Sequence, residues 1–408
     1  MKTLYLCYLG LREPLVQSQV LPYLREIREG GVGVRLVTFE PGWPQSWTPD
    51  EARRWGAQLA AERIEWQALA YHKSPSLLAT LYDIGRGAWT AFRALRRGEA
   101  DVLHARAHVP LVMAMLAKQL AGTGRVLFDI RGLVADEYVD AGVWKKSSLV
   151  YDGMKWVERF GIQHADGIVV LTERFRRWIE ERFQLDASMI EVIPCCADPA
   201  RYAPAQAEDD SERFEVLYAG SVTGLYLLDE MGRFFQLLQA QYPGAFFRIL
   251  TTSSASEATA RLVRLGLREE SFAVQRADPG EIPGHLRRAR VGLSFRTATF
   301  SQIAASPTKI AEYLAAGLPV VSNAGIGDTD QILLNDRVGV VVQDFSEESY
   351  EKAIADLGKL LQDRGLAERC RDAARRRFDL HHVGGERYRR LYRTIDLSGP
   401  ADRNRERM

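Results

Sequence analysis

The 408-residue sequence lacks the features that mark several large classes of protein. It has only four cysteines and no Cys-x-x-Cys pair, which excludes a disulfide-rich scaffold and the usual cysteine-based zinc sites. No apolar run reaches the length of a membrane-spanning helix, and the opening MKTLYLCYLG lacks the apolar core and cleavage site of a signal peptide. The net charge of +1 argues against a general nucleic-acid-binding protein. A globular protein of the reducing cytoplasm is the expected class.

Familiar catalytic and phosphate-binding motifs are missing as well. The first expected strand leads into LGLREPLVQSQ instead of a G-x-G-x-x-G turn, and the sequence has no P-loop. The segment GSVTG, residues 220–224, is not the G-x-S-x-G elbow of a hydrolase. His104 and His108 have no evident third metal ligand. Asp328 and Asp330 fit the cap and first turn of a helix better than a metal site. We therefore expect no bound metal and no cofactor.

Apolar runs of strand length alternate with amphipathic stretches almost from end to end. The expected strands are residues 3–9, 34–40, 64–71, 101–106, 125–130, 167–172 and 190–194, and then 214–219, 246–252, 271–277, 291–295, 319–323 and 338–344. The expected helices include residues 16–29, 76–97, 110–121 and 173–183. This alternation predicts parallel sheets covered by helices on both faces, which is the α/β class.

A break in this pattern divides the chain, which is too long for one ordinary core. Residues 199–213, PARYAPAQAEDDSER, combine Pro, Ala and clustered charges without an apolar period, as is typical of a linker. We therefore expect a first domain at 1–198 and a second at 214–380. The stretch 353–396 is expected to be helical throughout, and the tail 397–408 disordered.

The most informative segment reads SPTKIAEYLAAGLPVVSN and begins at Ser306. Ser306 is a good N-cap, Pro307 suits the first helical position, and Gly317 suits the left-handed turn that ends a helix. A helix that begins beside sheet strands offers free amides and a positive dipole end to an anion. Lys309 adds a cation in the first turn, and Glu312 lies on the same helix face.

This pattern suits a nucleotide diphosphate whose ribose hydroxyls need a hydrogen-bond acceptor. The alternative is that Lys309 and Glu312 form an ordinary ion pair on the surface.

A second group of charged residues follows two neighbouring strands of the first half. The stretch DIRGLVADEY, residues 129–138, follows the strand RVLF and contains Asp129, Arg131, Asp136 and Glu137. Arg106 ends the strand before it. Because the carboxyl ends of parallel strands form the usual ligand site of α/β folds, we expect these side chains to line a cleft. The alternative is an Arg131–Asp136 ion pair that only braces the loop.

The whole sequence resembles the GT-B glycosyltransferases of the retaining family four type. The most specific part is SPTKIAEYLAAGLPVVSNAGIGD, which is similar to the donor-site block of that family in its P-x-K-x-x-E-Y-L-A-A-G form. ADGIVVLTERFRRWI and VIPCCADPARYAP resemble the end of the family's first domain, and VLYAGSV resembles the start of its second. FDIRGLVADEYVDAGVW resembles a subgroup that assembles bacterial cell-surface polysaccharides.

The resemblance implies two facing Rossmann-like domains with parallel sheets and a C-terminal helix, residues 381–396, that crosses back to the first domain. It implies transfer of a sugar, with retention and without a metal, from a nucleotide sugar on the second domain to a glycan or lipid-linked acceptor on the first. The donor would be linked to UDP or GDP. Glu312 would bind the ribose, and Lys309 and Arg296 would meet the diphosphate.

Further site residues are implied in the same way. The additional donor contacts are Gly220, Ser221, Arg276, Ser306 and Thr308. The catalytic candidates on the acceptor side are Arg106, Asp129, Arg131, Asp136 and Glu137.

The sequence departs from the family pattern in three places. The family often has a pair of glutamates eight positions apart, but Ala304 stands where the first would be. The turn GSVTGLYLLDE has neither the Arg nor the Lys that often hold the phosphates, so more of that charge falls on Arg296 and Lys309. The active-site histidine of the first domain has no clear counterpart, and Asp129 or Arg131 stands near its place.

Two other functions fit the same sequence. One is a nucleotide-sugar epimerase of the same fold, which would need no acceptor. The other is a non-catalytic nucleotide-sugar-binding partner of another transferase. The missing carboxylate at Ala304 and the turn without cations favour this alternative.

A membrane contact is a further expectation. WKKSSLVYDGMKWVERF, residues 144–160, places three aromatic residues beside three lysines, which suits the surface of an anionic bilayer. The enzyme would then work at the inner face of the cell membrane. The alternative is that Leu149, Trp156 and Phe160 face the core.

Overall fold

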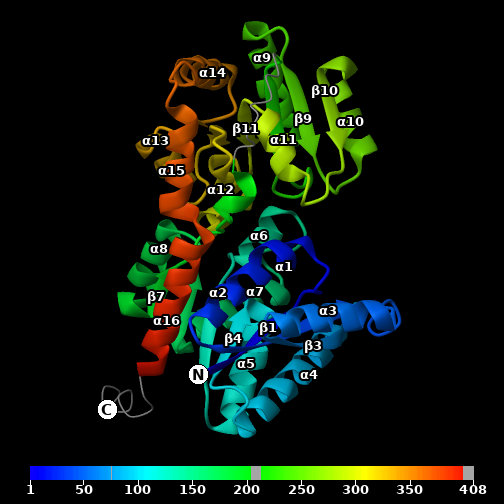
Figure 1. Ribbon diagram of the computed structural model, residues 1–408, viewed down its shortest axis with the longest axis vertical. Coiled ribbons are helices and arrows are strands. Elements are labelled where there is room, and N and C mark those ends of the chain that lie inside the picture. The colour runs from blue at the N-terminus through cyan, green and yellow to red at the C-terminus, as the bar shows by residue number, and fades with distance from the viewer. Residues whose placement is uncertain (75, 204–212, 398–408) are drawn as a thin grey trace. The chain divides into compact units, whose positions relative to one another are not determined.

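The computed structural model describes most of the chain in two compact units. The described residues are 1–74, 76–203 and 213–397. The first unit holds residues 1–135, 144–193 and the chain from Gly384 on, and the second holds 136–143 and 194–383. Residues 204–212 of the expected linker and 398–408 of the expected tail lie outside the described residues. Each unit contains its own parallel sheet with packed helices (Figure 1), so the predicted α/β class is confirmed.

The first unit is built on a seven-stranded parallel sheet in the order β3-β2-β1-β4-β5-β6-β7. Its strands are β1 (Lys2–Cys7), β2 (Gly33–Pro41), β3 (Ile64–Tyr71), β4 (Val102–Arg106), β5 (Arg125–Asp129), β6 (Gly167–Val170) and β7 (Ile190–Val192). Its helices are α1 (Pro14–Gln19), α2 (Leu21–Glu29), α3 (Pro49–Ala61), α4 (Ser76–Arg96), α5 (His108–Ala121), α7 (Leu149–His164), α8 (Glu173–Phe183) and α16 (Glu386–Leu397), with α6 (Val134–Asp140) spanning the division between the units.

The second unit contains a six-stranded parallel sheet in the order β10-β9-β8-β11-β12-β13. Its strands are β8 (Glu215–Ala219), β9 (Phe246–Leu250), β10 (Phe272–Gln275), β11 (Val291–Ser294), β12 (Val320–Asn323) and β13 (Gly339–Val342). Its helices are α9 (Leu228–Gln241), α10 (Ala255–Arg264), α11 (Ile282–Arg288), α12 (Thr308–Ala315), α13 (Thr329–Asn335), α14 (Glu347–Leu361) and α15 (Leu366–Phe378). Its 3-10 turns include η2 (Pro199–Tyr202) and η4 (Phe300–Ala304).

Every expected strand forms, with ends that shift by at most two residues, but the expected helix 16–29 is broken. The stretch 16–29 is divided into α1 and α2 at Val20, whose φ of −121° and ψ of −64° are not helical. Pro22 explains the break, because proline has no N–H for the helical ladder and its ring collides with the carbonyl four residues earlier.

The helical stretch at the C-terminal end is interrupted twice, contrary to the sequence-based expectation. Residues 362–365 separate α14 from α15, where the Asp363 carboxylate accepts from the Gly365 amide. A π-helical segment, Leu380–Gly385, separates α15 from α16, where the Asp379 carboxylate accepts from the amides of His381 and His382. Side chains that bind nearby amides compete with the helical ladder, which explains both interruptions.

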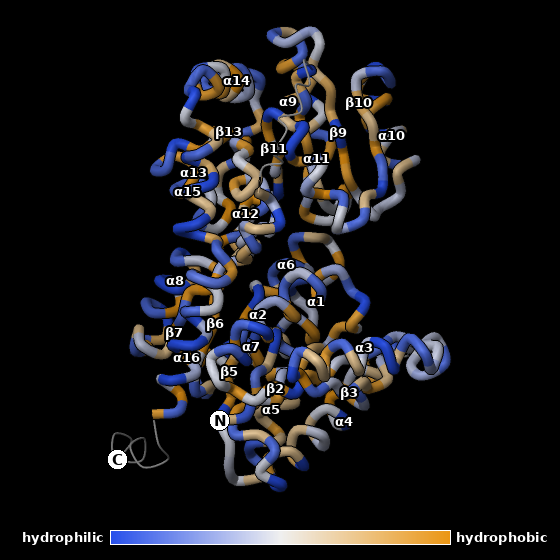
Figure 2. The backbone as a smooth tube through the Cα atoms, viewed as in Figure 1, coloured by the Kyte–Doolittle hydropathy of each residue, from blue (hydrophilic) through white to orange (hydrophobic). Residues whose placement is uncertain are grey.

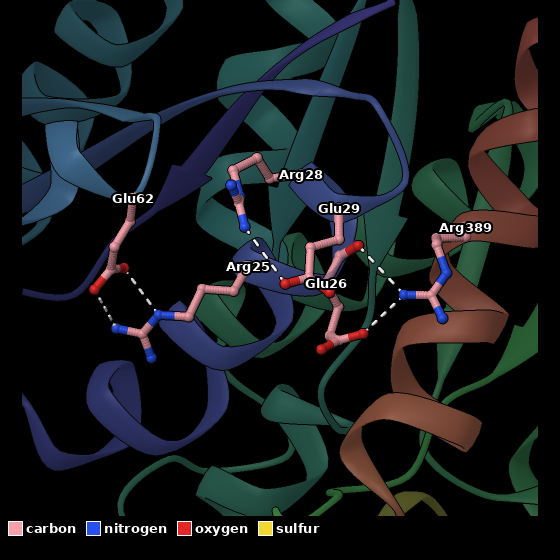
Figure 3. A network of polar contacts seen from close by, with 6 residues as sticks. All are labelled: Arg25, Glu26, Arg28, Glu29, Glu62 and Arg389. Atoms are coloured by element: carbon pink, nitrogen blue, oxygen red, sulfur yellow. Dashed lines mark hydrogen bonds and ion pairs between the residues drawn. The ribbon is translucent and has the colours of Figure 1, made fainter.

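The last helix, α16, packs on the first unit beside α2 and β7 (Figure 1). Its apolar stripe is buried, and Tyr388, Leu391 and Tyr392 are each at most 2% exposed. At the rim, the Arg389 guanidinium lies 2.7 Å from the buried carboxylate of Glu26 on α2 (Figure 3). The helix is therefore held by apolar packing with a directional polar contact at its edge.

In the second unit, a close approach between helix and sheet positions α12. Apolar residues run along strands such as β9, as Figure 2 shows, and helices cover both faces of the sheet. Gly292 in β11 lies against the Tyr313 ring, and a Cβ there would stand 2.3 Å from it. The Tyr313 hydroxyl accepts from the Ala219 amide at 2.9 Å. Tyr313 thus fixes α12 to both β8 and β11.

Candidate functional site

The first turn of α12 begins differently from the sequence-based expectation. Ser306 is not the N-cap: its hydroxyl accepts from the Cys195 amide at 3.2 Å, and Pro307 takes the cap position without a side-chain bond to the helix. Consequently, the first amides of α12 receive no side-chain cap. Gly317 follows the helix with a φ of 81°, as predicted for a left-handed end. Thr308 is half-buried in the first turn.

Lys309 points into the unit and not into solvent. Its side chain is 4% exposed, and its Nζ lies 4.2 Å from the ring centre of Tyr226 and 5.0 Å from that of Tyr218. Burial lowers the pKa of Lys309. Gly220 has a φ of 147°, and a Cβ at this position would stand 3.1 Å from the Lys309 Nζ. The turn after β8 therefore needs a glycine where it meets the lysine.

Arg296 brings a second cation to the same place. It follows β11, its amide donates to the Asn323 side chain at 2.8 Å, and its guanidinium carbon lies 4.9 Å from the Tyr226 ring centre. The Arg296 Nε is buried and has no hydrogen-bond partner. Within residues 1–74, 76–203 and 213–397, neither Arg296 nor Lys309 forms an ion pair with a carboxylate within 4.0 Å. Two cations at an uncapped helix start are well placed to hold an anion.

The lowered pKa of Tyr226 indicates a positive electric potential beside Lys309 and Arg296. Lys309 lowers the pKa of the Tyr226 hydroxyl, Arg296 adds to the effect, and both outweigh the opposing effect of burial. Lys309 also hydrogen-bonds to Tyr226. A site that favours a negative charge on a phenol favours a phosphate oxygen as well.

Glu312 lies one turn further along α12. Burial raises the pKa of the Glu312 carboxyl, although the Tyr202 hydroxyl of η2 and the nearby Lys309 act to lower it. The alternative of an exposed Lys309–Glu312 ion pair is wrong, because Lys309 is buried and the pair is not within ion-pair distance.

Two of the other predicted donor contacts differ in their setting. Ser221 lies in the turn after β8, where its hydroxyl accepts from the Thr223 amide at 3.2 Å. Arg276 is exposed after the edge strand β10, and β9 separates that strand from β8. The structure thus gathers Gly220, Lys309 and Arg296, whereas Arg276 is not among the groups that surround Tyr226.

The charged residues of the first unit form a buried cluster around Asp129. The Asp129 carboxylate is fully buried, lies 3.4 Å from Arg131 and 3.6 Å from Arg106, and accepts from the Tyr388 hydroxyl at 3.1 Å. Burial alone would raise the pKa of Asp129, but Arg131, His104 and Arg106 outweigh it and hold that pKa well below its ordinary value. Asp129 is therefore enclosed by the sheet and α16, while the Arg131 side chain keeps 11% exposure.

The two compact units share the expected second group of charges. Asp136 and Glu137 belong to the second unit, whereas Arg106, Asp129 and Arg131 belong to the first. The division falls within α6, after its first two residues. Burial raises the pKa of Glu137, and Arg296 opposes that rise.

Tyr202 and Tyr226 were missed by the sequence analysis. Tyr226 lies six residues after Gly220, in the turn noted for its lack of cations, and a tyrosine there carried no recognisable phosphate signal. Tyr202 lies at the start of the expected linker, far from Glu312 in the sequence. Only the folded chain brings these hydroxyls to the ends of α12.

Asp328 and Asp330 lie at the start of α13, where they have structural roles. Asp330 accepts from the Gly325 amide at 2.9 Å, and Asp328 takes the cap position of α13 without a side-chain cap bond. In the part of the chain that the structure describes, no three His, Cys, Asp or Glu side chains are grouped so that they could hold a metal ion. No helix of that part is long and apolar enough to span a bilayer.

Two family models match the chain. Residues 16–196 match the glycosyl transferase 4-like domain, and residues 203–377 match the glycosyl transferases group 1 domain. No curated relative matches the sequence.

Solved structures share the architecture over nearly the whole chain. HepE of Anabaena, solved with UDP and glucose, is 15% identical with a TM-score of 0.68 and covers 97% of this chain and 99% of its own. The sucrose-phosphate synthase of Thermosynechococcus elongatus is 14% identical with a TM-score of 0.68 and covers 98% and 100%. WaaG, a glycosyltransferase involved in lipopolysaccharide biosynthesis, is 15% identical with a TM-score of 0.66 and covers 98% and 100%. At these identities the likeness establishes the fold.

The fold and the two matched domains define the class: the protein is a glycosyltransferase of the GT-B fold. More closely, the chain belongs to the glycosyltransferases that join a 4-like first domain to a group 1 second domain.

Proposed function

We propose that this glycosyltransferase moves a hexosyl group, with retention, from a nucleotide sugar to a glycan or lipid-linked acceptor in bacterial cell-surface polysaccharide biosynthesis. The observation that carries the donor assignment is the pair of cations at the uncapped start of α12, the buried Lys309 and the half-buried Arg296. Two solved relatives of the same fold support the substrate class. HepE of Anabaena was solved with UDP-glucose, and WaaG acts in lipopolysaccharide biosynthesis.

The donor would lie along α12 with its diphosphate at the helix start. Lys309, Arg296 and the first amides would meet the phosphate oxygens, and the Tyr226 hydroxyl would donate to one of them. Glu312 would accept from the ribose hydroxyls, with Tyr202 holding its carboxylate in place. The base would be uracil or guanine. Ala304, which is fully buried, offers no carboxylate to the donor sugar.

The acceptor side would be the first unit. Arg131 would contact the acceptor or the leaving diphosphate, while the enclosed Asp129 and its neighbour Arg106 would hold that guanidinium in position. Asp136 and Glu137 would contribute from the segment that belongs with the second unit. In Glu137, a pKa raised by burial makes a proton available near neutral pH more readily than an ordinary carboxyl would.

Catalysis would not need a metal, because two cations and the helix start already offset the diphosphate charge. We expect transfer to continue unchanged in excess EDTA. Loss of activity in EDTA, with rescue by Mg²⁺ or Mn²⁺, would contradict this and return attention to Asp328 and Asp330.

A peripheral contact with the inner face of the cell membrane would bring the enzyme to lipid-linked acceptors. On α7, the Leu149 and Trp156 side chains are 88% and 63% exposed, and Lys145 and Lys146 just before the helix are exposed as well. A groove of about 410 Å³ between α5 and α7 is lined mainly by apolar side chains, including Leu116 and Trp156. Exposed aromatic and aliphatic groups beside lysines fit an anionic bilayer surface.

A thermal-shift panel of UDP-, GDP-, ADP- and dTDP-linked sugars tests the proposed donor class. A ligand that binds only the folded state raises the unfolding temperature by mass action. We expect a rise with the UDP- or GDP-linked sugars, followed by sugar transfer to an acceptor. No rise with any of the four classes would contradict the assignment of the donor.

The missing carboxylate at Ala304 favours a second candidate, a non-catalytic nucleotide-sugar-binding protein. Nucleotide binding without turnover across a broad acceptor panel would support it. Conversion of the donor alone into an isomeric nucleotide sugar would instead identify an epimerase.

A further inference from the structure

A buried carboxylate in the first unit organises three segments at the carboxyl edge of the sheet. Asp83 of α4 is fully buried and accepts from the Tyr8 hydroxyl at 2.9 Å and from the His72 amide at 3.0 Å. Its second oxygen lies 2.6 Å from the His72 Nδ1. Tyr8 follows β1 and His72 follows β3, so Asp83 joins the ends of two parallel strands. Ligands of α/β folds usually bind at that edge.

The contact with Asp83 determines how His72 meets its surroundings. Since Nδ1 faces a carboxylate, it carries a ring proton, and Nε2 is left to meet a partner other than Asp83. The His72 side chain is 40% exposed, whereas Asp83 is 0% exposed. A buried carboxylate thus orients an accessible imidazole.

One aromatic ring packs against this imidazole, and two others pack on each other at the ends of β1 and β3. Tyr82 meets the His72 ring edge to face with centres 5.0 Å apart, and the Tyr82 side chain is 55% exposed. Tyr71 packs against Tyr8 with centres 5.3 Å apart. Burial and Asp83 raise the pKa of Tyr8, so its hydroxyl remains a donor to Asp83.

A purely structural role explains Asp83 and Tyr8 but not the rest of the arrangement. A brace between β3 and α4 needs only the His72 amide and Nδ1, and it does not need an exposed Tyr82 ring beside the imidazole. A metal site would need a third ligand, and no group of three potential metal ligands occurs among residues 1–74, 76–203 and 213–397. A neutral polar ligand with an apolar face fits both exposed groups.

We propose that His72 and Tyr82 form a binding subsite for a neutral sugar of the acceptor. The His72 Nε2 hydrogen-bonds to a sugar hydroxyl, which can donate or accept, and the Tyr82 ring packs against the C–H face of the same sugar. The proposal rests on the proposed transferase function, because it assigns part of the acceptor site in the first unit.

Two variants of the full chain separate this role from a brace. His72→Asn keeps an N–H where Nδ1 faces Asp83 but removes the position of Nε2. Tyr82→Ala removes an exposed ring that the core does not need. His382→Asn, at an exposed histidine of the second unit, is the matched control.

The probes are the p-nitrophenyl glycosides of glucose, galactose and mannose, titrated by saturation-transfer NMR with and without UDP. We expect at least one glycoside to bind the wild type, and both His72→Asn and Tyr82→Ala to raise its Kd about tenfold, as for the loss of one good contact. The control should bind like the wild type, and the Kd of UDP should be unchanged in all variants.

Equal glycoside affinity in the wild type and both variants would overturn the proposal, as would a wild type that binds none of the glycosides. Failure of UDP to bind the wild type would instead count against the proposed donor site. The titration without UDP would still measure glycoside binding at the subsite in that case, so the two failures are distinguishable. If His72→Asn unfolds, Tyr82→Ala decides alone.

Discussion

At the scale of single residues, the proposed donor site depends on a buried lysine that has no carboxylate within ion-pair distance among the described residues. Burial of an amine disfavours its charged form, and here that effect lowers the pKa of Lys309. Arg296 beside it disfavours the charge further. In the proposed site, a phosphate between these cations would offset their repulsion through charge-assisted hydrogen bonds. The free protein would thus carry an unfavourable arrangement that a bound anion relieves.

Glu312→Ala is expected to weaken the binding of a UDP- or GDP-linked sugar while the protein stays folded. The ribose would lose a charge-assisted hydrogen bond worth about 1.5–3 kcal/mol, which is roughly a 10- to 100-fold rise in Kd. Calorimetric titration measures the change, and Glu351→Ala, at an exposed position on α14, is the control. An unchanged donor affinity in Glu312→Ala would remove Glu312 from the site.

Asp129→Asn is expected to destabilise the first unit in a manner that depends on pH. A carboxyl whose pKa falls on folding adds stability above its unfolded pKa, here ordinarily 3.8, and that stability is lost as the pH falls toward the folded value. The variant leaves buried guanidinium groups without their counter-charge, so it should be less stable by about 3–5 kcal/mol at pH 7.

The difference in stability between wild type and Asp129→Asn should narrow below about pH 4. Urea unfolding at pH 7, 5, 4 and 3.5 measures it, with the exposed Asp152→Asn on α7 as the control. A difference that stays constant over this range would show that the charge of Asp129 does not matter for folding.

At the scale of elements, local chemistry predicted the strands well and the contacts of side chains poorly. Apolar runs such as Leu318–Val321 are visible in the sequence because both faces of a parallel strand are buried. The same applies to the left-handed Gly317, whose position after the last helical turn is a local signal. Ser306 was misassigned because the Cys195 amide, far away in the sequence, competes for its hydroxyl.

The amphipathic helix α7 and the two lysines just before it lead us to predict a contact with anionic membranes. Flotation at low salt should recover more protein with anionic vesicles than with neutral ones, because lysines near the surface each gain about 1 kcal/mol from anionic lipids. Replacement of Lys145 and Lys146 by Gln together with Trp156→Ala should remove the difference. Replacement of Lys352 and Lys359 on α14 by Gln is the matched control.

Equal recovery with both kinds of vesicle, unaffected by the α7 substitutions, would exclude docking through this helix.

At the scale of the whole molecule, the fold class followed from the alternation of strands and helices, and the family from the segment around Lys309 and Glu312. The site could be predicted only in part. Tyr202 and Tyr226 approach α12 from other elements, and no spacing in the sequence indicates that approach. In the same way, Tyr388 of the last helix donates to Asp129, a contact that no spacing in the sequence indicates.

The central claim is that a nucleotide diphosphate binds at the start of α12, and titration of UDP into the wild type and Lys309→Met in the presence of EDTA tests it most directly. Lys352→Met, at an exposed lysine of the same unit, is the control. We predict that UDP binds the wild type and the control alike, and that Lys309→Met weakens binding at least about tenfold. UDP binding of equal strength in Lys309→Met, or no binding to the wild type by UDP or GDP, would contradict the account.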